Sequence, residues 1–240
     1  MTRGSGSGRH RGGFRKTPAR CAATLAVLLA AGAAAHAGAD PQPGEPSWML
    51  EGFAGAAYNV QTELRIEQHG QDQIELAARY ETRPFESPIY YALRIGRAKG
   101  GRAWEGELIH HKLYLMNPPD EVQYFSVSHG YNLLFLNRAW ERHGTDLRAG
   151  AGVVIVHPEN GVRGLELATG GGTFGGGYSL TGPALQGCVG RRFVIGRGAF
   201  FALEGKITLA YARVSVTQGE AAVPSLAVHA LAGFGYRFGG

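Results

Sequence analysis

Side chains that could transfer protons or act as nucleophiles stand in segments where apolar and polar residues alternate. His110, Asn132 and Ser128 belong to two neighbouring segments of this kind, and Glu204 belongs to a later one. Imidazole and carboxylate groups exchange protons near neutral pH, and a serine hydroxyl becomes a nucleophile when a base accepts its proton. We therefore predict that His110, Glu204, Asn132 and Ser128, which the alternation turns inward, are catalytic. Because Ser128 and His129 are adjacent, a strand would turn them to opposite faces and prevent a Ser–His pair.

Further side chains could bind a substrate or a metal ion. For contact with a substrate we predict four residues that the alternation turns inward: Lys112, Lys206, Arg94 and His229. His157 and Glu159 flank Pro158, and such side chains could hold a divalent metal ion, although their spacing matches no standard zinc motif. The alternative is structural, because charges buried in a narrow interior must pair with one another.

The segments that carry these residues have the length and alternation of strands. A strand that crosses a membrane needs about 9–11 residues, and eight segments fit: roughly 50–59, 88–97, 103–115, 122–138, 147–157, 179–195, 199–216 and 225–238. In residues 199–216, Leu203 and Ile207 share one face, whereas Glu204 and Lys206 share the other. This pattern suits a wall between lipid and a packed polar interior. We predict an all-β fold, namely an antiparallel up-and-down transmembrane β-barrel of eight strands.

The connections alternate between short turns and longer loops, as such barrels require. The short turns lie near residues 97–102, 140–146 and 196–198, and the longer loops are 60–87, 116–121, 158–178 and 217–224. Residues 62–69 and 72–82 alternate as well. We interpret them as a hairpin that extends the first outer loop, and a ten-stranded barrel is the alternative. Residues 131–142 could suit a helix, but we prefer a strand because their apolar residues alternate. A soluble barrel of the lipocalin type is the other fold alternative, against which outward aromatic residues near the strand ends favour a membrane.

The N-terminus has the features of a secretory signal peptide. Six basic residues precede an apolar stretch from Cys21 to Ala35, and Ala35-His36-Ala37 is a small-x-small cleavage site. A membrane anchor is the weaker interpretation, because the apolar stretch is short. We predict a signal peptide over 1–37, a flexible leader over 38–47 and an outer-membrane barrel domain over 48–240.

Cleavage would change the charge of the chain. Six of the 24 basic residues and none of the 19 acidic residues lie in residues 1–37, which leaves 18 basic and 19 acidic residues. The mature chain therefore carries no basic surface that would indicate nucleic-acid binding. Only Cys188 remains, so no intrachain disulfide is expected.

Several short motifs follow one another between residues 48 and 238: Pro88-Ile89-Tyr90-Tyr91, His110-His111-Lys112, His129-Gly130-Tyr131-Asn132, His157-Pro158-Glu159 and Glu204-Gly205-Lys206-Ile207-Thr208. In this order they resemble a family of small proteobacterial outer-membrane barrels, some of whose members are labelled lipid A oxidase. The resemblance implies oxidation of the proximal glucosamine of lipid A to an aminogluconate with oxygen. It also implies an acidic residue before the Gly-x-Asn unit, where this chain has His129. Because no flavin or nicotinamide motif is present, a divalent metal ion would be the simplest cofactor.

Three functions are consistent with these patterns. An enzyme that modifies lipid A, as an oxidase, deacylase or acyltransferase, would bring His110, Lys112, Asn132 and Glu204 together in the outer half of the membrane. A non-enzymatic structural or surface-interaction barrel would pair the same groups off within a closed lumen, and a narrow pore would leave the lumen open. The expected partners are outer-membrane lipid and lipopolysaccharide. The barrel-assembly machinery is a further expected partner, because the last strand ends in aromatic residues at Phe238.

Overall fold

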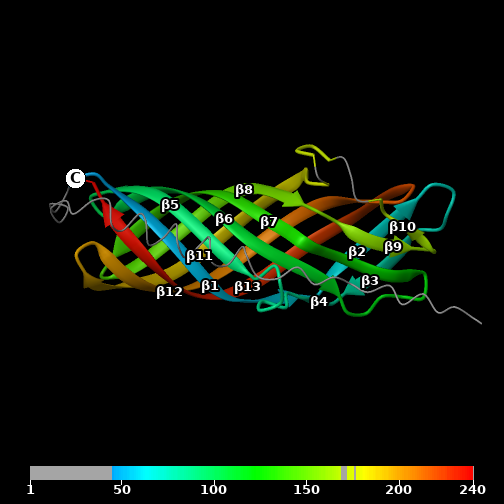
Figure 1. Ribbon diagram of the computed structural model, residues 1–240, viewed down its shortest axis with the longest axis horizontal. Coiled ribbons are helices and arrows are strands. Elements are labelled where there is room, and N and C mark those ends of the chain that lie inside the picture. The colour runs from blue at the N-terminus through cyan, green and yellow to red at the C-terminus, as the bar shows by residue number, and fades with distance from the viewer. Residues whose placement is uncertain (1–44, 169–171, 176, 240) are drawn as a thin grey trace, which may run out of the picture. The chain divides into compact units, whose positions relative to one another are not determined.

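The computed structural model describes residues 45–168, 172–175 and 177–239, without the side chains of Ser128 and His129 (Figure 1). The chain divides into residues 1–37 and residues 38–240, and every described residue belongs to the second unit. The predicted signal peptide and most of the predicted leader therefore lie outside the described residues. Within the described part every regular element is a strand, and no helix there could cross a membrane.

Eight long strands form a closed ring, as predicted. They are β1 (Ser47–Val60), β5 (Tyr91–Lys99), β6 (Arg102–Leu115), β7 (Val122–Arg142), β8 (Thr145–Val156), β11 (Ser179–Gly196), β12 (Ala199–Val216) and β13 (Gly219–Phe238). Each strand pairs antiparallel with the next, and β1 pairs with both β5 and β13, which closes the ring. Every predicted segment overlaps one of these strands. Residues 131–142 continue β7 and form no helix.

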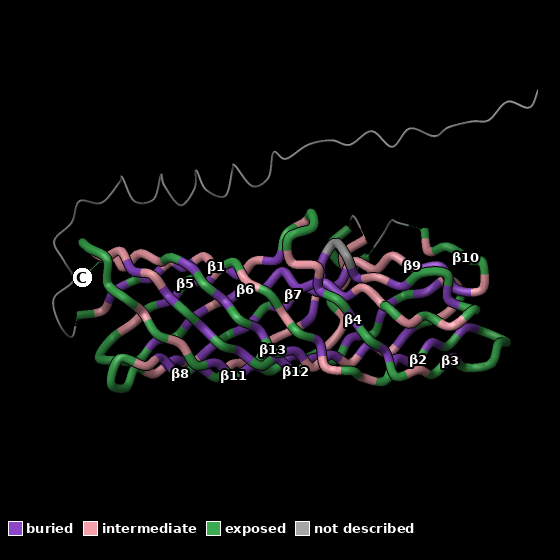
Figure 2. The backbone as a smooth tube through the Cα atoms, turned by 90° about the horizontal axis from the view of Figure 1, so that it is seen from below, coloured by how far each residue is buried: buried purple, intermediate pink, exposed green. Residues whose placement is uncertain are grey.

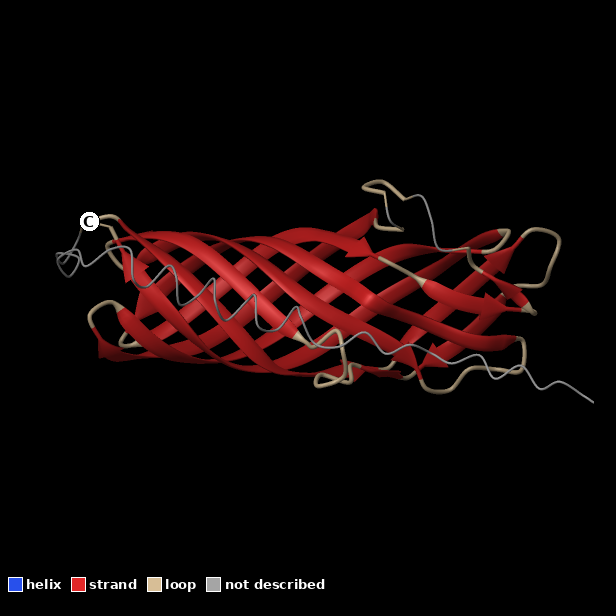
Figure 3. Cartoon of the chain, viewed as in Figure 1, coloured by secondary structure: helices blue, strands red, loops and turns tan. Residues whose placement is uncertain are grey.

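Five short strands extend one end of the ring (Figure 3). They are β2 (Thr62–Gln68), β3 (Ile74–Ala78), β4 (Tyr80–Glu81), β9 (Glu159–Val162) and β10 (Leu165–Glu166). β2 and β3 form the predicted hairpin, and β2 also pairs with the start of β13. The alternative of ten membrane strands is therefore wrong, because this hairpin continues the barrel lengthwise and does not widen the ring.

The two ends of the barrel differ in their connections. Short turns at residues 100–101, 143–144 and 197–198 share one end with the C-terminus, and we call this the proximal end (Figure 1). The other end, which we call distal, carries the five short strands. The predicted loop over residues 217–224 is wrong. β12 and β13 run on to a tight turn at Thr217 and Gln218, and Pro224 lies within β13 opposite Tyr211.

The interior changes from charged to apolar along the barrel. Its proximal part encloses the charged side chains Glu51, Arg94, Glu105, Glu107, Asp146, Arg148, Glu204 and Lys206. Its distal part encloses an apolar core that includes Leu64, Ile66, Phe125, Val127, Val162, Val214 and Val216. Buried and exposed residues alternate along the strands in both parts (Figure 2). Polar side chains consequently face inward in the proximal part and outward in the distal part, where Arg213 pairs with Glu220 on the surface.

Candidate functional site

The charged side chains of the proximal interior form a network centred on Arg94. Arg94 Nη2 lies 2.6 Å from a carboxylate oxygen of Glu204 and 2.9 Å from one of Glu107, and Nη1 lies 3.2 Å from Glu51. Lys206 Nζ pairs with Glu107 and lies 3.2 Å from Glu204. Arg94, Glu204 and Lys206 therefore face one interior and contact one another, as the alternation of the sequence predicted.

Two further arginines complete this network. Arg148 Nε lies 2.8 Å from Glu105 Oε2, and its Nη1 lies 3.0 Å from Glu204 Oε2. Arg192 Nη1 lies 2.7 Å from Asp146 Oδ1. The network therefore sets the four cations Arg94, Arg148, Arg192 and Lys206 against the five carboxylates Glu51, Glu105, Glu107, Asp146 and Glu204. Interlocked charges of this kind fill the narrow interior of an eight-stranded barrel and leave each charge with an opposite partner.

A layer of neutral hydrogen bonds lies between the charges and the apolar core. His229 Nδ1 is 2.7 Å from the Tyr90 hydroxyl, and His229 Nε2 is 2.8 Å from the Thr208 hydroxyl. His111 Nε2 is 2.9 Å from Asn59 Oδ1, and the rings of the two histidines are 5.3 Å apart. His229, predicted to contact a substrate, is therefore enclosed by hydrogen-bond partners inside the barrel.

The prediction that His110, Lys112 and Asn132 face the interior is wrong. The inward positions of β6 beyond the charges are taken by Ile109, His111 and Leu113, all fully buried. His110 and Lys112 occupy the alternate positions of β6, which face outward, because the odd-numbered residues from Ala103 to Leu113 face inward throughout the strand. The four residues expected to converge in an enzyme therefore split, with Glu204 inside the barrel and the other three on its outer wall.

On that wall, Tyr91, His110 and Asn132 stand side by side, and we call these three residues the wall row. Tyr91 pairs with His110 across β5 and β6, and His110 pairs with Asn132 across β6 and β7. The rings of Tyr91 and His110 stack with their centroids 5.1 Å apart and an interplanar angle of 17°. His110 Nδ1 lies 2.7 Å from Asn132 Oδ1. This contact fixes the orientation of the imidazole, which is how partner groups commonly position a catalytic histidine.

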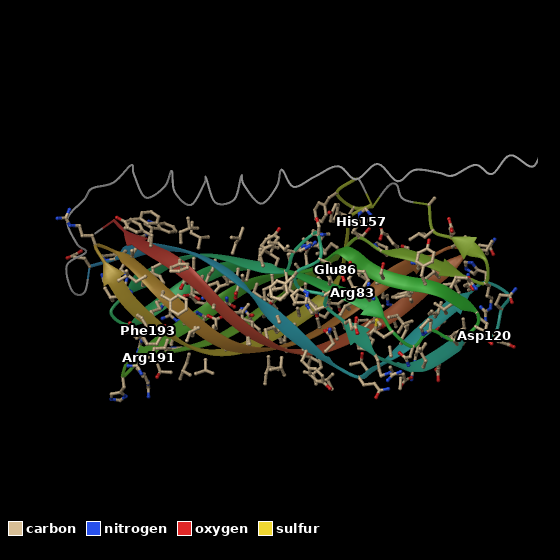
Figure 4. All side chains as sticks on the ribbon, turned by 60° about the horizontal axis from the view of Figure 1, so that its bottom comes forward. Arg83, Glu86, Asp120, His157, Arg191 and Phe193 are labelled. Atoms are coloured by element: carbon tan, nitrogen blue, oxygen red, sulfur yellow. The ribbon has the colours of Figure 1, made fainter. Side chains whose placement is uncertain are left out.

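The loop over residues 82–90 is fixed against the wall beside this row. Lys112 Nζ donates hydrogen bonds of 2.8 Å to the backbone carbonyls of Arg83 and Glu86. The Arg83 guanidinium lies over the Tyr114 ring at 4.5 Å. Arg83 and Glu86 lie midway along the barrel in Figure 4, between Arg191 near one end and Asp120 at the other. Lys112 therefore holds a loop in place, where the sequence predicted substrate contact.

A second loop approaches the wall on the side of β8. His157 lies between β8 and β9, and its ring meets the Tyr178 ring edge-on at 4.9 Å. Its backbone N–H donates to the Gly130 carbonyl at 3.2 Å. In the part of the chain that the structure describes, no group of three or more His, Cys, Asp and Glu side chains could hold a metal ion. His157 and Glu159 therefore lack a third such ligand there, and the metal stays a prediction.

The wall row lies where the apolar outer surface of β5, β6 and β7 ends, because Lys112 is the next outward residue of β6. On each of β5, β6 and β7, the wall-row residue lies six residues toward the distal end from a residue of a second row. This second row consists of the cross-strand partners Arg97, Trp104 and Arg138. On the opposite side, the six outward positions of β12 from Phe201 to Tyr211 hold no polar side chain other than the Tyr211 hydroxyl. The polar row thus lies at a level where other strands present apolar side chains.

Sequence reasoning found His110 and Asn132 but missed their partner Tyr91, and it missed Glu107 and Arg148 of the network. Tyr91 becomes a partner only through the register of β5 with β6, which alternation alone does not reveal. For Glu107 a signal existed, because Glu105 and Glu107 are two residues apart and mark the inward face of β6. The side chain of Ser128, predicted as a nucleophile, lies outside the described residues.

No protein-family model matches the chain, and no curated protein matches it. Several solved structures match at low identity. The outer membrane protein AlkL is 12% identical with a TM-score of 0.49, over 85% of this chain and 95% of AlkL. OprG from Pseudomonas aeruginosa is 13% identical with a TM-score of 0.46, over 85% of this chain and 99% of OprG. Ail of Yersinia pestis is 11% identical with a TM-score of 0.37, over 82% of this chain and all of Ail. At these identities the likeness concerns the fold alone.

Proposed function

We propose that this protein is an outer-membrane β-barrel with a closed lumen, and that its wall row acts on the polar head of a glycolipid such as lipid A. One observation carries the proposal: on the outer side of the wall, His110, which is only 6% exposed, is hydrogen-bonded to the half-buried Asn132. Polar side chains at a lipid-facing position are unfavourable, and an ionisable residue there indicates a functional site.

The outer surface supports placement in a membrane. Large apolar side chains are exposed around the barrel, among them Leu203, Ile207, Leu209 and Val228, each more than 40% exposed. The apolar band of such barrels is about 25 Å tall. The wall row lies six residues along the strands from the row of Arg97, Trp104 and Arg138. Six residues of strand span about 20 Å, and a tilted strand rises less than that across the membrane. This arithmetic supports a position for the wall row in the outer half of the band, on the acyl-chain side of the headgroup of a glycolipid.

The geometry of His110 suits proton transfer. When Nδ1 carries the hydrogen that Asn132 Oδ1 accepts, Nε2 is the basic nitrogen of the imidazole. Because Nε2 is buried, a sugar hydroxyl or a water molecule would reach it only after the neighbouring groups move. Stacking on Tyr91 limits rotation of the imidazole. Two reactions use such a base on a glycolipid: oxidation at a sugar carbon, which the family resemblance implies, and hydrolysis of an acyl ester. The choice between them stays a prediction.

A second candidate function is favoured by the interior. Because the charges of the lumen pair with one another, the barrel could serve without catalysis, and the wall row would then only brace the loop over residues 82–90. A pore is the least favoured function, since the charge network fills the barrel at the level of Arg94.

Mass spectrometry of lipid A separates the two candidates. The protein is expressed in a Gram-negative host, and folding is checked for every variant by the shift of the unheated band in gel electrophoresis. We expect a change in lipid A mass with the wild type and at least about a tenfold loss of that product with His110→Ala, a typical effect of removing a general base.

Two matched controls make the result specific. Leu134→Ala changes an exposed apolar residue two positions from Asn132 on the same strand face, and it should leave the product unchanged. His229→Ala removes a histidine from inside the barrel and should leave the product per folded molecule unchanged. A lipid A profile that is the same with and without the folded protein would exclude the enzymatic proposal.

A further inference from the structure

Basic residues gather on the outer surface near the proximal end of the barrel. Seven Lys and Arg residues lie there, namely Arg97, Lys99, Arg102, Arg138, Arg142, Arg191 and Arg197, whereas the acidic residues near this end and outside the internal network are Glu45 and Glu141. The distal end has the opposite balance, with acidic residues such as Asp72, Glu75, Asp120 and Glu121. The outer surface is therefore polarised, with its positive end beside the short turns.

Four residues of this basic region form a continuous row across four neighbouring strands. Trp48 of β1 pairs with Arg97 of β5, Arg97 pairs with Trp104 of β6, and Trp104 pairs with Arg138 of β7. We call this row the Trp–Arg ladder. All four side chains lie on the outward face, and the two indole rings are 43% and 56% exposed.

Aromatic rings hold the guanidinium groups of the ladder in place. Arg97 Cζ lies 5.8 Å from the ring centroid of Trp48, and Arg138 Cζ lies 5.1 Å from that of Trp104. On another part of the proximal rim, Arg191 Cζ lies 5.6 Å from the Phe193 ring, and both residues project from the outer surface in Figure 4. Stacking on a ring occupies the face of a guanidinium and leaves its N–H groups directed outward around the edge.

The charges of the ladder differ in pairing from those inside the barrel. Among the residues that the structure describes, neither Arg97 nor Arg138 forms an ion pair with a carboxylate, although Arg138 reaches the Ala103 carbonyl at 3.5 Å. Arginines on the distal outer surface are paired, Arg65 with Glu63 and Arg213 with Glu220. An arginine edge that no carboxylate occupies is suited to a phosphate, which it can bind through two parallel hydrogen bonds.

From this arrangement we propose that the Trp–Arg ladder binds the phosphates of anionic phospholipids in the periplasmic leaflet. The inference rests on the proposed placement in an outer membrane, because short turns face the periplasm and put the proximal end in that leaflet. Indole rings prefer the interface between acyl chains and headgroups, and each guanidinium stacked on them then lies at phosphate level. The partner is a phosphatidylglycerol-like lipid, since its net negative charge complements the basic rim.

Electron paramagnetic resonance in bilayers tests the ladder. The mature protein is reconstituted in phosphatidylcholine, and binding of spin-labelled phosphatidylglycerol is compared with that of spin-labelled phosphatidylcholine. The wild type should prefer phosphatidylglycerol, and R97Q/R138Q should reduce this preference about threefold or more. R97K/R138K should reduce it less, because lysine keeps the charge and loses the planar hydrogen-bonding edge.

The control is R65Q/R213Q, which removes two paired arginines from the distal surface and should leave the preference unchanged. Arg97→Gln alone is a second, milder variant should the double variant fold poorly, and it should lower the preference by a smaller factor. The ladder proposal fails if the inserted wild type shows no preference for phosphatidylglycerol. It also fails if the folded R97Q/R138Q variant keeps the wild-type preference, and in both cases the membrane placement stands. A wild type that does not enter bilayers would instead overturn the membrane placement on which both proposals rest.

Discussion

The charged network inside the barrel and the wall row outside it are separated only by the thickness of the barrel wall. Arg94 lies three residues from Tyr91 toward the proximal end of β5, and Glu107 lies three residues from His110 toward the proximal end of β6. Inside, every charge meets charges of opposite sign within a closed ring of strands. Outside, the buried His110 and the half-buried Asn132 meet each other on the outer side of the wall.

This difference separates structure from function. Inside a barrel, each charge gains a partner of opposite sign in place of the water that it loses on burial. The presence of these charges therefore does not require a ligand. Polar groups that face lipid have no such reason to be there, because an apolar side chain would be more favourable at the same position. The two regions should therefore respond in opposite ways to mutation, with stability affected inside and activity affected outside.

The largest expected effect is on the inside. Glu204→Ala removes a carboxylate that contacts Arg94, Arg148 and Lys206, and it leaves three buried cations with fewer partners. Breaking a buried ion pair costs about 3–5 kcal/mol. Unfolding of the reconstituted protein in urea should show a loss of this size, with the lipid A product per folded molecule unchanged. A folded Glu204→Ala variant of normal stability that makes no product would place the chemistry inside the barrel.

A smaller effect is expected from the contact that holds the loop over residues 82–90. Lys112→Met keeps the length of the side chain but removes hydrogen bonds to two backbone carbonyls. Each lost hydrogen bond costs about 0.5–1.5 kcal/mol, so the loop should open locally while the barrel stays folded. Chymotrypsin should then cut faster after Phe85, which is 84% exposed in this loop.

Phe174 provides an internal reference for that measurement. It is 63% exposed in the loop that precedes β11, and it has no contact with Lys112. The ratio of cleavage after Phe85 to cleavage after Phe174 should rise in Lys112→Met. An unchanged ratio would show that the loop is held by other contacts, such as that of Arg83 with Tyr114.

The same comparison explains how far the sequence could predict the structure. Alternation located all eight strands and turned Arg94, Glu204, Lys206 and His229 inward, because lipid outside and charge inside impose opposite preferences on successive residues. It failed for His110 and Asn132, since the interior becomes apolar beyond the histidine layer and reverses the pattern. It also failed at residues 217–224, where it predicts a loop although residues 219–224 belong to β13.

The sharpest test of the wall row is a substitution that should harm activity without harming the fold. Asn132→Leu replaces the partner of His110 by the residue type that Leu134 and Leu136 present on the same outward face. A leucine is favoured at a lipid-facing position, whereas the buried His110 loses one hydrogen-bond partner, so we expect the free energy of unfolding to fall by no more than about 1–3 kcal/mol. The lipid A product should fall strongly, because His110 Nδ1 loses the oxygen that orients the ring. If Asn132→Leu instead destabilises the barrel as much as Glu204→Ala and keeps its product, the wall row is a structural contact and the two regions do not differ in role.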